Sequence, residues 1–297
     1  MATILTLTAN PMIDYLTTGR IVADSVNRLG HFTPLAGGKG LNMGRVLARH
    51  GHRVIATGFA GGTEGGLLAD LTAADGMEPA FVTTAARTRI GFITIDPERG
   101  GCTSVLEHGS QITSVELGTM MQQMRAMVSS ADLVLIGGSV PNETCNGLYR
   151  QVLDLCALEK VTCWVDAYGA VMDEALNGAN PPAFAKPNKE EYGKGRRWLP
   201  CRELHLSDGS NELKIRHPEG RFRVKPPKVK TINPVGSGDC YVAALAHARL
   251  SGMTLIDQLR YASAAGAANA ARVDIARISP IDIRAIIDQV EVTSVKE

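Results

Sequence analysis

The 297-residue sequence lacks several features that would assign it to a broad class at once. No apolar run approaches the roughly 20 residues of a membrane-spanning helix, so we do not expect a membrane protein. The 31 basic and 30 acidic side chains leave a net charge of +1, which argues against binding to nucleic acid or to anionic membranes through overall charge. The N-terminal segment MATILTLTANP has neither a basic start nor a cleavage site after an apolar core. We therefore expect no signal peptide and a cytoplasmic location.

Motifs for zinc and for common nucleotide folds are also missing. The six cysteines form no C-x-x-C pair and no zinc-binding spacing, which is typical of reduced, mostly buried thiols. The P-loop pattern G-x-x-x-x-G-K-[ST] is absent, and no G-x-G-x-x-G follows the first apolar run, where NPMIDY stands instead. These absences disfavour a P-loop enzyme and an oxidoreductase with a Rossmann-type sheet.

What the sequence does contain is an alternation of strand-like and helix-like segments. Short apolar runs that suit buried strands occupy 3–9, 53–60, 132–138, 162–167 and 182–188. Helical spacing of apolar residues marks 39–51, 63–76, 142–156, 241–252, 254–273 and 279–291, the last with Ser279 as N-cap and Pro280 in the first turn. The alternation predicts an α/β protein with a doubly wound, mostly parallel sheet, whose ligands bind at the carboxyl ends of the strands.

Two segments, 15–36 and 87–109, interrupt this alternation. Both are rich in polar residues and alternate between apolar and polar positions, as hairpins do. DPERGG in the second segment is a turn between two strands. We expect them to form a small β-sheet lid over a main domain made of 1–14, 37–86 and 110–297. Alternatively, they are edge strands of the main sheet.

A glycine-rich turn, NPVGSGD, precedes the helix that starts near residue 237. Gly236, Ser237 and Gly238 would let backbone N–H groups at the helix N-terminus converge on an anion such as phosphate. An acid at the same place, Asp239, has two interpretations. It is either a helix cap or a general base that deprotonates an attacking hydroxyl during phosphoryl transfer.

A second glycine-rich segment, AGGKGLNMG, lies at another helix start. Gly37, Gly38, Lys39 and Asn42 either form a plain turn that begins the helix or bind a polyol. In the second interpretation backbone amides and Asn42 contact hydroxyls, and Lys39 reaches a phosphate.

Together these motifs resemble the ribokinase-like (PfkB) carbohydrate kinases. The similarity is greatest to the branch of 1-phosphofructokinase and tagatose-6-phosphate kinase. The matching stretches, in family order, are LTLTANPMIDY, AGGKGLNMGRVLARHG, TRIGFITI, GGSVP, KPNKEEY and NPVGSGDC. They extend from residue 3 to about residue 270, and a chance match of all six is not credible.

The resemblance implies a ribokinase-like fold and an enzyme that transfers phosphate from ATP, with Mg²⁺, to a sugar phosphate. It implies substrate contacts at Asp14, Gly37, Gly38, Lys39, Asn42, Arg89 and Ser139, with Asp239, Gly236, Ser237 and Gly238 as the catalytic group. It implies ATP contacts at Lys186, Asn188, Glu191 and Asn269, with Glu191 holding Mg²⁺ through water. It also implies a homodimer that pairs through the lids.

Some stretches depart from the family pattern. The segment between Asn188 and the glycine-rich turn is short by roughly a helix pair, and LSDGSN replaces the usual turn beside the nucleotide. We therefore expect weak binding of ATP and poor discrimination against GTP. Gly91 stands where the branch often has Asn, and DAYGA at 166–170 lacks the usual hydroxyl residues. An alternative function is a sugar-phosphate sensor that kept the fold and lost good ATP binding.

Overall fold

The computed structural model describes residues 1–193 and 195–295, and its framework is a large twisted sheet. The strands follow one another in the order β15-β14-β13-β12-β11-β10-β9-β1-β4-β5, and β6 pairs with β4 beyond this path. Their bounds are β1 (Thr3–Thr8), β4 (Arg53–Gly61), β5 (Glu78–Pro79), β6 (Val82–Thr84), β9 (Leu133–Gly137), β10 (Cys163–Asp166), β11 (Phe184–Ala185), β12 (Glu203–Leu206), β13 (Leu213–His217), β14 (Gly220–Lys225) and β15 (Glu291–Val295).

Most neighbours in this sheet are parallel. Every neighbouring pair along the path β12-β11-β10-β9-β1-β4-β5 is parallel, and so is the pair β4–β6. The pairs β12–β13, β13–β14 and β14–β15 are antiparallel. Strands β1, β9 and β10 are almost entirely buried, because helices cover both faces of the sheet and neither face is exposed to solvent there. The predicted α/β class with a doubly wound, mostly parallel sheet is confirmed.

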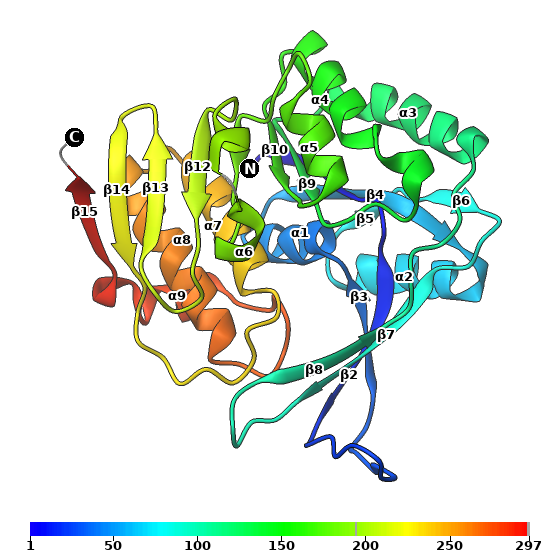
Figure 1. Cartoon of the computed structure of the whole chain (residues 1–297), viewed down its shortest axis with the longest axis horizontal. Helices are drawn as coiled ribbons and strands as arrows, with labels where there is room; N and C mark the ends of the chain where they lie inside the picture. The colour runs from blue at the N-terminus through cyan, green and yellow to red at the C-terminus, as the bar shows by residue number, and fades with distance from the viewer. Residues whose placement is uncertain (194, 296–297) are drawn as a thin grey trace.

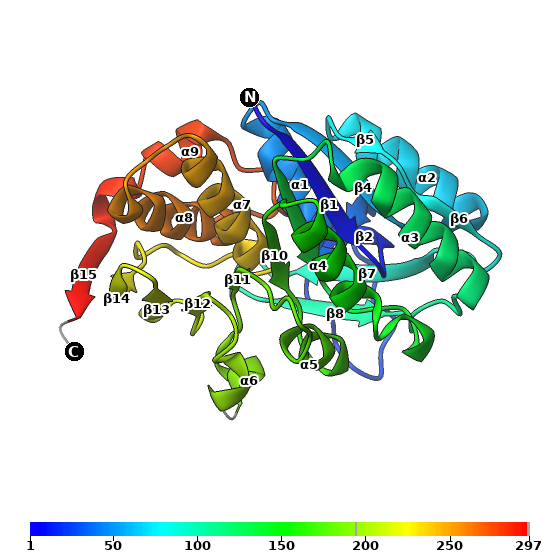
Figure 2. The ribbon, with the colours of Figure 1, turned by 90° about the horizontal axis from the view of Figure 1, so that it is seen from above.

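The helices pack on the sheet through two separate hydrophobic clusters. One cluster joins α1, α7 and α8 to the sheet, and the other joins α3, α4 and α5 to it. In Figure 2, α7, α8 and α9 lie together along one side of strands β12 to β14. The bounds are α1 (Lys39–Arg49), α2 (Gly62–Ala74), α3 (Ser114–Val128), α4 (Leu148–Leu158), α5 (Ala170–Leu176), α6 (Lys189–Tyr192), α7 (Ser237–Leu250), α8 (Leu255–Ala270), α9 (Pro280–Arg284), and the 3-10 turns η1 (Glu143–Cys145), η2 (Gly195–Trp198) and η3 (Ile287–Gln289).

A smaller sheet projects from the main body (Figure 1). It contains β2 (Met12–Thr18), β3 (Thr33–Gly37), β7 (Arg89–Ile95) and β8 (Cys102–Leu106) in the order β3-β2-β7-β8. The interpretation of these segments as edge strands of the main sheet is therefore wrong, and they form the small β-sheet expected as a lid. The division of the chain into two domains stays a prediction.

The C-terminal segment differs from its helical prediction. Ser279 caps α9 with a capping box and Pro280 opens the helix, as predicted. The helix ends at Arg284, however, and the chain continues through η3 into β15, which pairs with β14 at the edge of the sheet. The apolar spacing of 279–291 was too short to separate one helical turn from a full helix. None of the helices within residues 1–193 and 195–295 combines the length and apolar character needed to cross a membrane.

Candidate active site

A cavity of about 960 Å³ lies at the carboxyl ends of the parallel strands, between the main sheet and the smaller one. It is lined from the smaller sheet by β2, β7 and β8, and from the main body by the starts of α1 and α7 and by part of α8. The predicted site residues that line it are Asp14, Gly38, Lys39, Asn42, Lys186, Asn188, Glu191, Gly236, Ser237, Gly238 and Asp239. Four others, Gly37, Arg89, Ser139 and Asn269, are not among its lining residues.

Asp239 lies in the first turn of α7 but does not cap the helix. The N-cap is Gly236, so no side chain caps the start of α7. The Asp239 side chain is 5% exposed, and its Oδ2 accepts a hydrogen bond of 2.8 Å from the Asn42 side-chain amide. Burial raises the pKa of Asp239, Lys39 opposes that rise, and Asp166 adds to it. The cap interpretation is wrong, and Asp239 instead lines the cavity.

The start of α7 has the geometry of an anion-binding site. Gly236 adopts a left-handed conformation with φ of 80°, and a Cβ there would lie 2.9 Å from Ile275. The N–H groups of Gly238 and Asp239 precede Cys240, whose N–H donates the first helical hydrogen bond to the Gly236 carbonyl, and they point out of the helix end, whereas the N–H of Ser237 already donates to the Pro234 carbonyl. Only part of the predicted anion-binding backbone is therefore available.

Lys186 adds a positive charge at the same helix end. A Cβ on Gly238 would lie 2.9 Å from the Lys186 Nζ, so the ammonium lies directly against that glycine. The lysine is 6% exposed and lines the cavity. A buried cation and a helix N-terminus that converge on one point favour a phosphate-sized anion there.

Lys39, which lines the cavity, forms an ion pair with the buried Asp166. The Lys39 Nζ lies 3.2 Å from the Asp166 Oδ2. Burial would lower the pKa of Lys39, but Asp166 and other carboxylates outweigh it and raise that pKa. Burial would raise the pKa of Asp166, yet the charges of Lys39 and Lys186 lower it overall. The sequence-based interpretation of Lys39 as a phosphate contact did not include this pairing.

Asp166 is a functional candidate that the sequence prediction did not name as a site residue. It is the last residue of β10 and 2% exposed, and its neighbours are both lysines of the site. An acid that ends a continuously apolar strand was the available signal, because such strand ends meet at the ligand-binding edge of a parallel sheet.

Asp14 approaches the cavity from β2, on the side of the smaller sheet. It is 6% exposed, and burial raises its pKa from 3.8 to about 6 despite the opposing charges of Arg89 and Arg45. Glycines make room for its carboxylate, since a Cβ on Gly37 would lie 2.1 Å from Oδ2 and one on Gly91 would lie 2.8 Å from Oδ1. The unusual glycine at position 91 thus has a steric reason.

Arg89 and Ser139 meet at the carboxyl end of β1 through a residue that was not predicted, Asn10. The Arg89 Nη2 donates to the Asn10 carbonyl at 3.0 Å, and the Asn10 side-chain amide donates to the Ser139 hydroxyl at 3.2 Å. Arg89 also donates to the Glu107 carbonyl, while its buried Nε makes no hydrogen bond within the described residues. The guanidinium is thus fixed in place beside Asp14 by backbone carbonyls and keeps further donors.

Asn269 supports the glycine-rich turn from behind and does not line the cavity. Its side chain is fully buried, donates to the Val235 carbonyl and the Ser237 hydroxyl, and accepts from the Ala276 N–H. All its polar atoms are therefore occupied, and the prediction of direct contact with ATP requires correction. Its position behind the turn depends on a hydrogen bond to Ser237, which lies 32 residues away along the chain, and the sequence does not reveal such a contact.

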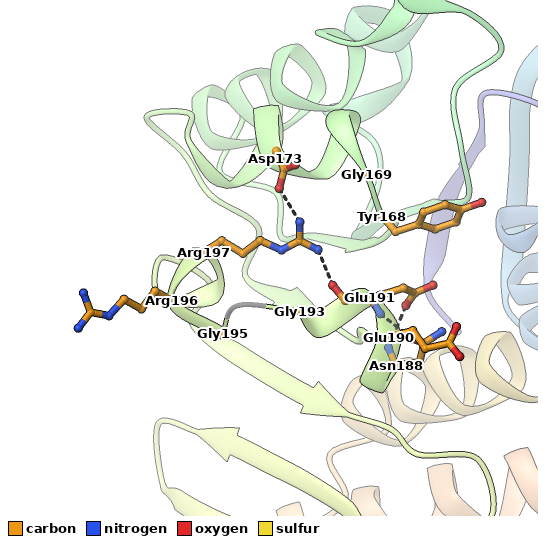
Figure 3. A pocket seen from close by; sticks show the side chains of 10 residues that line it. All are labelled: Tyr168, Gly169, Asp173, Asn188, Glu190, Glu191, Gly193, Gly195, Arg196 and Arg197. Atoms are coloured by element: carbon orange, nitrogen blue, oxygen red, sulfur yellow. Dashed lines mark hydrogen bonds and ion pairs between the residues drawn. The ribbon is translucent and has the colours of Figure 1, made fainter.

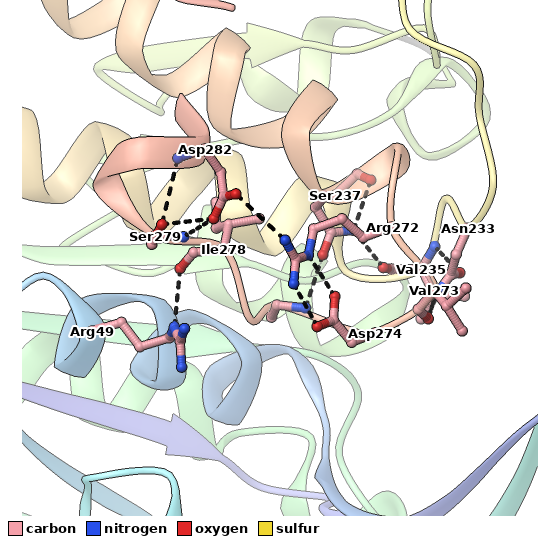
Figure 4. A network of polar contacts seen from close by, with 12 residues as sticks. Arg49, Asn233, Val235, Ser237, Arg272, Val273, Asp274, Ile278, Ser279 and Asp282 are labelled. Atoms are coloured by element: carbon pink, nitrogen blue, oxygen red, sulfur yellow. Dashed lines mark hydrogen bonds and ion pairs between the residues drawn. The ribbon is translucent and has the colours of Figure 1, made fainter. Parts of the chain in front are cut away.

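The same support extends across the loop that follows α8. Asn233 donates to the Val273 carbonyl and accepts from the Val235 N–H, and Arg272 pairs with Asp274 in this loop (Figure 4). The glycine-rich turn is thus tied on its far side to a well-ordered network of polar contacts, which fixes the direction of its N–H groups.

Asn188 and Glu191 form a capping box at the start of α6. Each side chain accepts a 2.8 Å hydrogen bond from the backbone N–H of the other. They lie between the cavity and a second, more open pocket of about 1210 Å³, which is also lined by Tyr168 and Arg197 (Figure 3). Glu191 contributes to the field at Lys39, so its charge acts on the cavity.

These carboxylates fit a magnesium ion by their donor chemistry. Mg²⁺ prefers oxygen ligands and usually takes one or two carboxylates together with waters and substrate phosphates. Asp166 at the end of β10 and Glu191, which lines the cavity, are such donors. Within the described residues no group of three or more histidine, cysteine or acidic side chains is arranged to hold a metal.

Comparisons with known proteins agree with this geometry. The sequence pattern of the pfkB family carbohydrate kinases matches residues 8–194 and 202–281. The chain belongs to this family. It is therefore a carbohydrate kinase, and the resemblance identified from the motifs is confirmed.

Several of the solved structures similar to this chain are described as phosphofructokinases or possible phosphofructokinases. A protein described as a possible 1-phosphofructokinase from Thermotoga maritima is 21% identical, with a TM-score of 0.90, and the match covers 99% of this chain and 100% of that one. A candidate phosphofructokinase from Staphylococcus aureus is 28% identical, with a TM-score of 0.81 and coverage of 98% and 99%. Phosphofructokinase-2 from Escherichia coli in complex with fructose-6-phosphate is 24% identical, with a TM-score of 0.85 and coverage of 97% and 99%. These matches confirm the ribokinase-like fold.

The matches bear on the segment after Asn188, which the family pattern predicts to be short by a helix pair. Because the alignments cover nearly all of both chains, they give no support to a missing lobe on the nucleotide side. The cavity itself extends past Ser207 and Gly209 of the LSDGSN stretch to Ser263 and Ala267 of α8. The LSDGSN stretch and α8 therefore line one and the same cavity.

Proposed function

We propose that this pfkB-family kinase transfers the terminal phosphoryl group of ATP to a hydroxyl of a sugar phosphate, with Asp239 as general base. One observation carries the proposal: a buried carboxylate lies at the same point of the cavity as a helix N-terminus and the Lys186 ammonium. A site that only bound anions would not place an acid there, since it would repel them. A base for an attacking hydroxyl must lie there.

The proposed reaction is a single in-line displacement. The substrate hydroxyl gives its proton to Asp239 as its oxygen forms a bond to the terminal phosphorus, and the bond from that phosphorus to the bridging oxygen breaks to release ADP. The N–H groups of Gly238 and Asp239 and the ammonium of Lys186 stabilise the charge on the phosphoryl oxygens. The pfkB family implies ATP as donor. When bound beside Asp166 and Glu191, Mg²⁺ would neutralise charge on the ATP phosphates.

The second substrate is proposed to carry a phosphate because of Arg89. Lys39 is neutralised by Asp166, but Arg89 has its terminal nitrogens fixed by backbone carbonyls and keeps unused N–H donors. An arginine prepared in this way is suited to a phosphate and has no role toward a neutral sugar. Fructose 1-phosphate, fructose 6-phosphate and tagatose 6-phosphate are the substrates to compare.

The test is a coupled ADP-release assay with these three sugar phosphates and with the unphosphorylated sugars, for the wild type and for Asp239→Asn. We expect turnover of at least one sugar phosphate. We expect roughly a 10²–10⁴-fold lower kcat in the variant, with binding of the sugar phosphate by calorimetry largely retained. A variant with near-normal kcat would rule out the base. Binding of sugar phosphates without ADP release by the wild type would instead favour the sensor function.

We also propose that two copies pair through the outer face of the smaller sheet. On that face Tyr15 stacks on Phe92, and Phe32 packs edge-on against Phe92, with Phe92 and Phe32 44% and 47% exposed. Val105 on the neighbouring strand is 66% exposed. An exposed aromatic group of this kind is typical of an interface. Phe92→Asp should convert a dimer into a monomer in light scattering, and a wild-type monomer at micromolar concentration would contradict the proposal.

A further inference from the structure

Arg45 is a fully buried arginine whose hydrogen bonds lead directly to the candidate base. It lies on α1, and its side chain is 1% exposed. Its Nε donates to the Asp75 Oδ2 at 2.6 Å, its Nη1 to the Asn42 Oδ1 at 2.9 Å, and its Nη2 to the Ala36 carbonyl at 2.6 Å. A guanidinium is planar and rigid, so three acceptors in one plane fix its position.

This arrangement determines which way the Asn42 amide points. Arginine has only donors, so the Asn42 atom that faces Arg45 must be its oxygen. The amide NH₂ therefore faces the other way and donates to the Asp239 Oδ2 at 2.8 Å. An amide turned around would place its NH₂ against a cation and its oxygen against a carboxylate. Arg45 thus holds Asn42 in the single orientation that serves Asp239.

Asp75 anchors the arginine at the other end. It follows α2, is 9% exposed in its side chain, and uses Oδ2 for Arg45 and Oδ1 for Arg277 at 3.0 Å. Arg277 belongs to the loop after α8 that also supports the glycine-rich turn. Burying an unpaired guanidinium such as that of Arg45 would destabilise the folded protein, because the charge loses its hydration. The carboxylate of Asp75 offsets this cost.

We propose that Arg45 is a positioning residue for the kinase reaction, which keeps Asp239 ionised and oriented by fixing the Asn42 amide. This inference rests on the proposed role of Asp239 as base. Because Oδ2 of Asp239 already accepts from Asn42, the substrate proton goes to Oδ1. The donated hydrogen bond acts against the burial that raises the pKa of Asp239.

Several charged groups surround Asp239 and contribute to its titration. Lys39 from α1 and Lys186 after β11 favour the ionised form, and Asp166 from β10 disfavours it. Asp14 from β2 is close enough to feel Arg45 and titrates near 6, so its contribution must be separated from that of Asp239. Cys240, next in α7, has its pKa raised by burial and by Asp239.

The test is the pH dependence of kcat in Arg45→Met, which removes the donors and keeps much of the side-chain volume. Loss of the fixed amide should raise the midpoint of the acid limb of kcat by about one pH unit, since a hydrogen bond to a charged group corresponds to roughly that shift. KM for the sugar phosphate should change less than about twofold, because substrate contacts remain. An unchanged midpoint would overturn the proposal.

A matched control and a backup variant keep this result interpretable. Arg277→Met removes the other arginine from Asp75 and leaves the contact of Arg45 with Asn42, so its midpoint should equal that of the wild type. A shift as large as that of Arg45→Met would mean that general loosening is responsible, and would overturn the proposal. If Arg45→Met does not fold, the double variant Arg45→Met/Asp75→Asn, which also removes the buried acid that has lost Arg45, carries the same expected shift.

A direct titration separates this inference from the proposed reaction. Carboxyl ¹³C resonances of labelled aspartate, assigned with Asp239→Asn and Asp14→Asn, report each pKa without any turnover. In Arg45→Met the Asp239 resonance should titrate about one pH unit higher than in the wild type. If no sugar phosphate is turned over, the proposed function fails while this titration still tests Arg45. An Asp239 resonance that does not shift refutes the positioning role on its own.

Discussion

Replacing Asp14 with asparagine should stabilise the folded protein at neutral pH. The side chain is buried, and burial raises its pKa from 3.8 to about 6, with only partial relief from Arg89 and Arg45. A pKa that is higher in the folded than in the unfolded chain means that the folded state prefers the protonated acid. The associated stability is therefore present below pH 3.8 and is lost as the pH rises through about 6.

The size of the effect follows from the two pKa values. The difference of roughly two units, at about 1.4 kcal/mol per unit, corresponds to about 3 kcal/mol at pH 8. An asparagine of the same shape carries no charge and avoids this cost, although its amide must find a place beside Gly37 and Gly91. For a chain of this length the gain corresponds to a rise of about 6 °C in Tm.

The assay is chemical denaturation of the ligand-free wild type and of Asp14→Asn between pH 4 and pH 8. The difference in the free energy of unfolding should be close to zero at pH 4 and grow to about 3 kcal/mol at pH 8. Asp70→Asn, which removes an exposed carboxylate from α2, serves as the control and should change little at either pH. A gain that is equal at both pH values, or a loss at pH 8, would refute the burial argument. The stabilised variant should also bind sugar phosphate more weakly, because residues that serve binding often destabilise the ligand-free protein.

Two further substitutions test the surroundings of Asp14. Arg89→Ala should raise KM for a phosphorylated sugar roughly 10- to 100-fold and change KM for its unphosphorylated analogue little, and equal effects in the coupled assay would show that Arg89 does not contact the phosphate. Gly91→Asn should destabilise the protein by about 1–3 kcal/mol in denaturation, because its Cβ would lie 2.7 Å from Leu106 and 2.8 Å from Asp14. Gly66→Ala, at an open position in α2, is its control.

Much of the central fold could be predicted because its signals are local. Strands β1, β4, β9 and β10 are short, almost entirely buried runs rich in apolar and β-branched residues, and this pattern has few alternatives in a sheet covered on both faces. The strand β15 was missed because its five residues are mostly exposed and depend on pairing with β14, which sequence spacing does not reveal. Its exposure removes the hydrophobic alternation that would have marked it.

The candidate site could be predicted only where a family motif marks a residue type. Asp239 and Asn42 each belong to such a motif, but they are 197 positions apart, and their hydrogen bond is a result of the fold. The buried role of Asn269 and the ion pair of Asp166 likewise depend on partners from other elements. A motif identifies a residue type, whereas its contacts decide whether it binds a ligand or holds a loop.

The charges around the cavity explain why a divalent cation should be needed. The carboxylates are those of Asp14, Asp166, Glu191 and Asp239, and the cations that line or adjoin the cavity are Lys39, Lys186, Arg89 and Lys228. The two sets roughly cancel, so the protein offers little net positive charge to two phosphorylated ligands. ATP and a sugar phosphate together bring several negative charges into a buried space, where repulsion is poorly screened. A magnesium ion at Asp166 and Glu191 would supply what the side chains do not. The lysines and the end of α7 would then be left to stabilise the phosphoryl group during transfer.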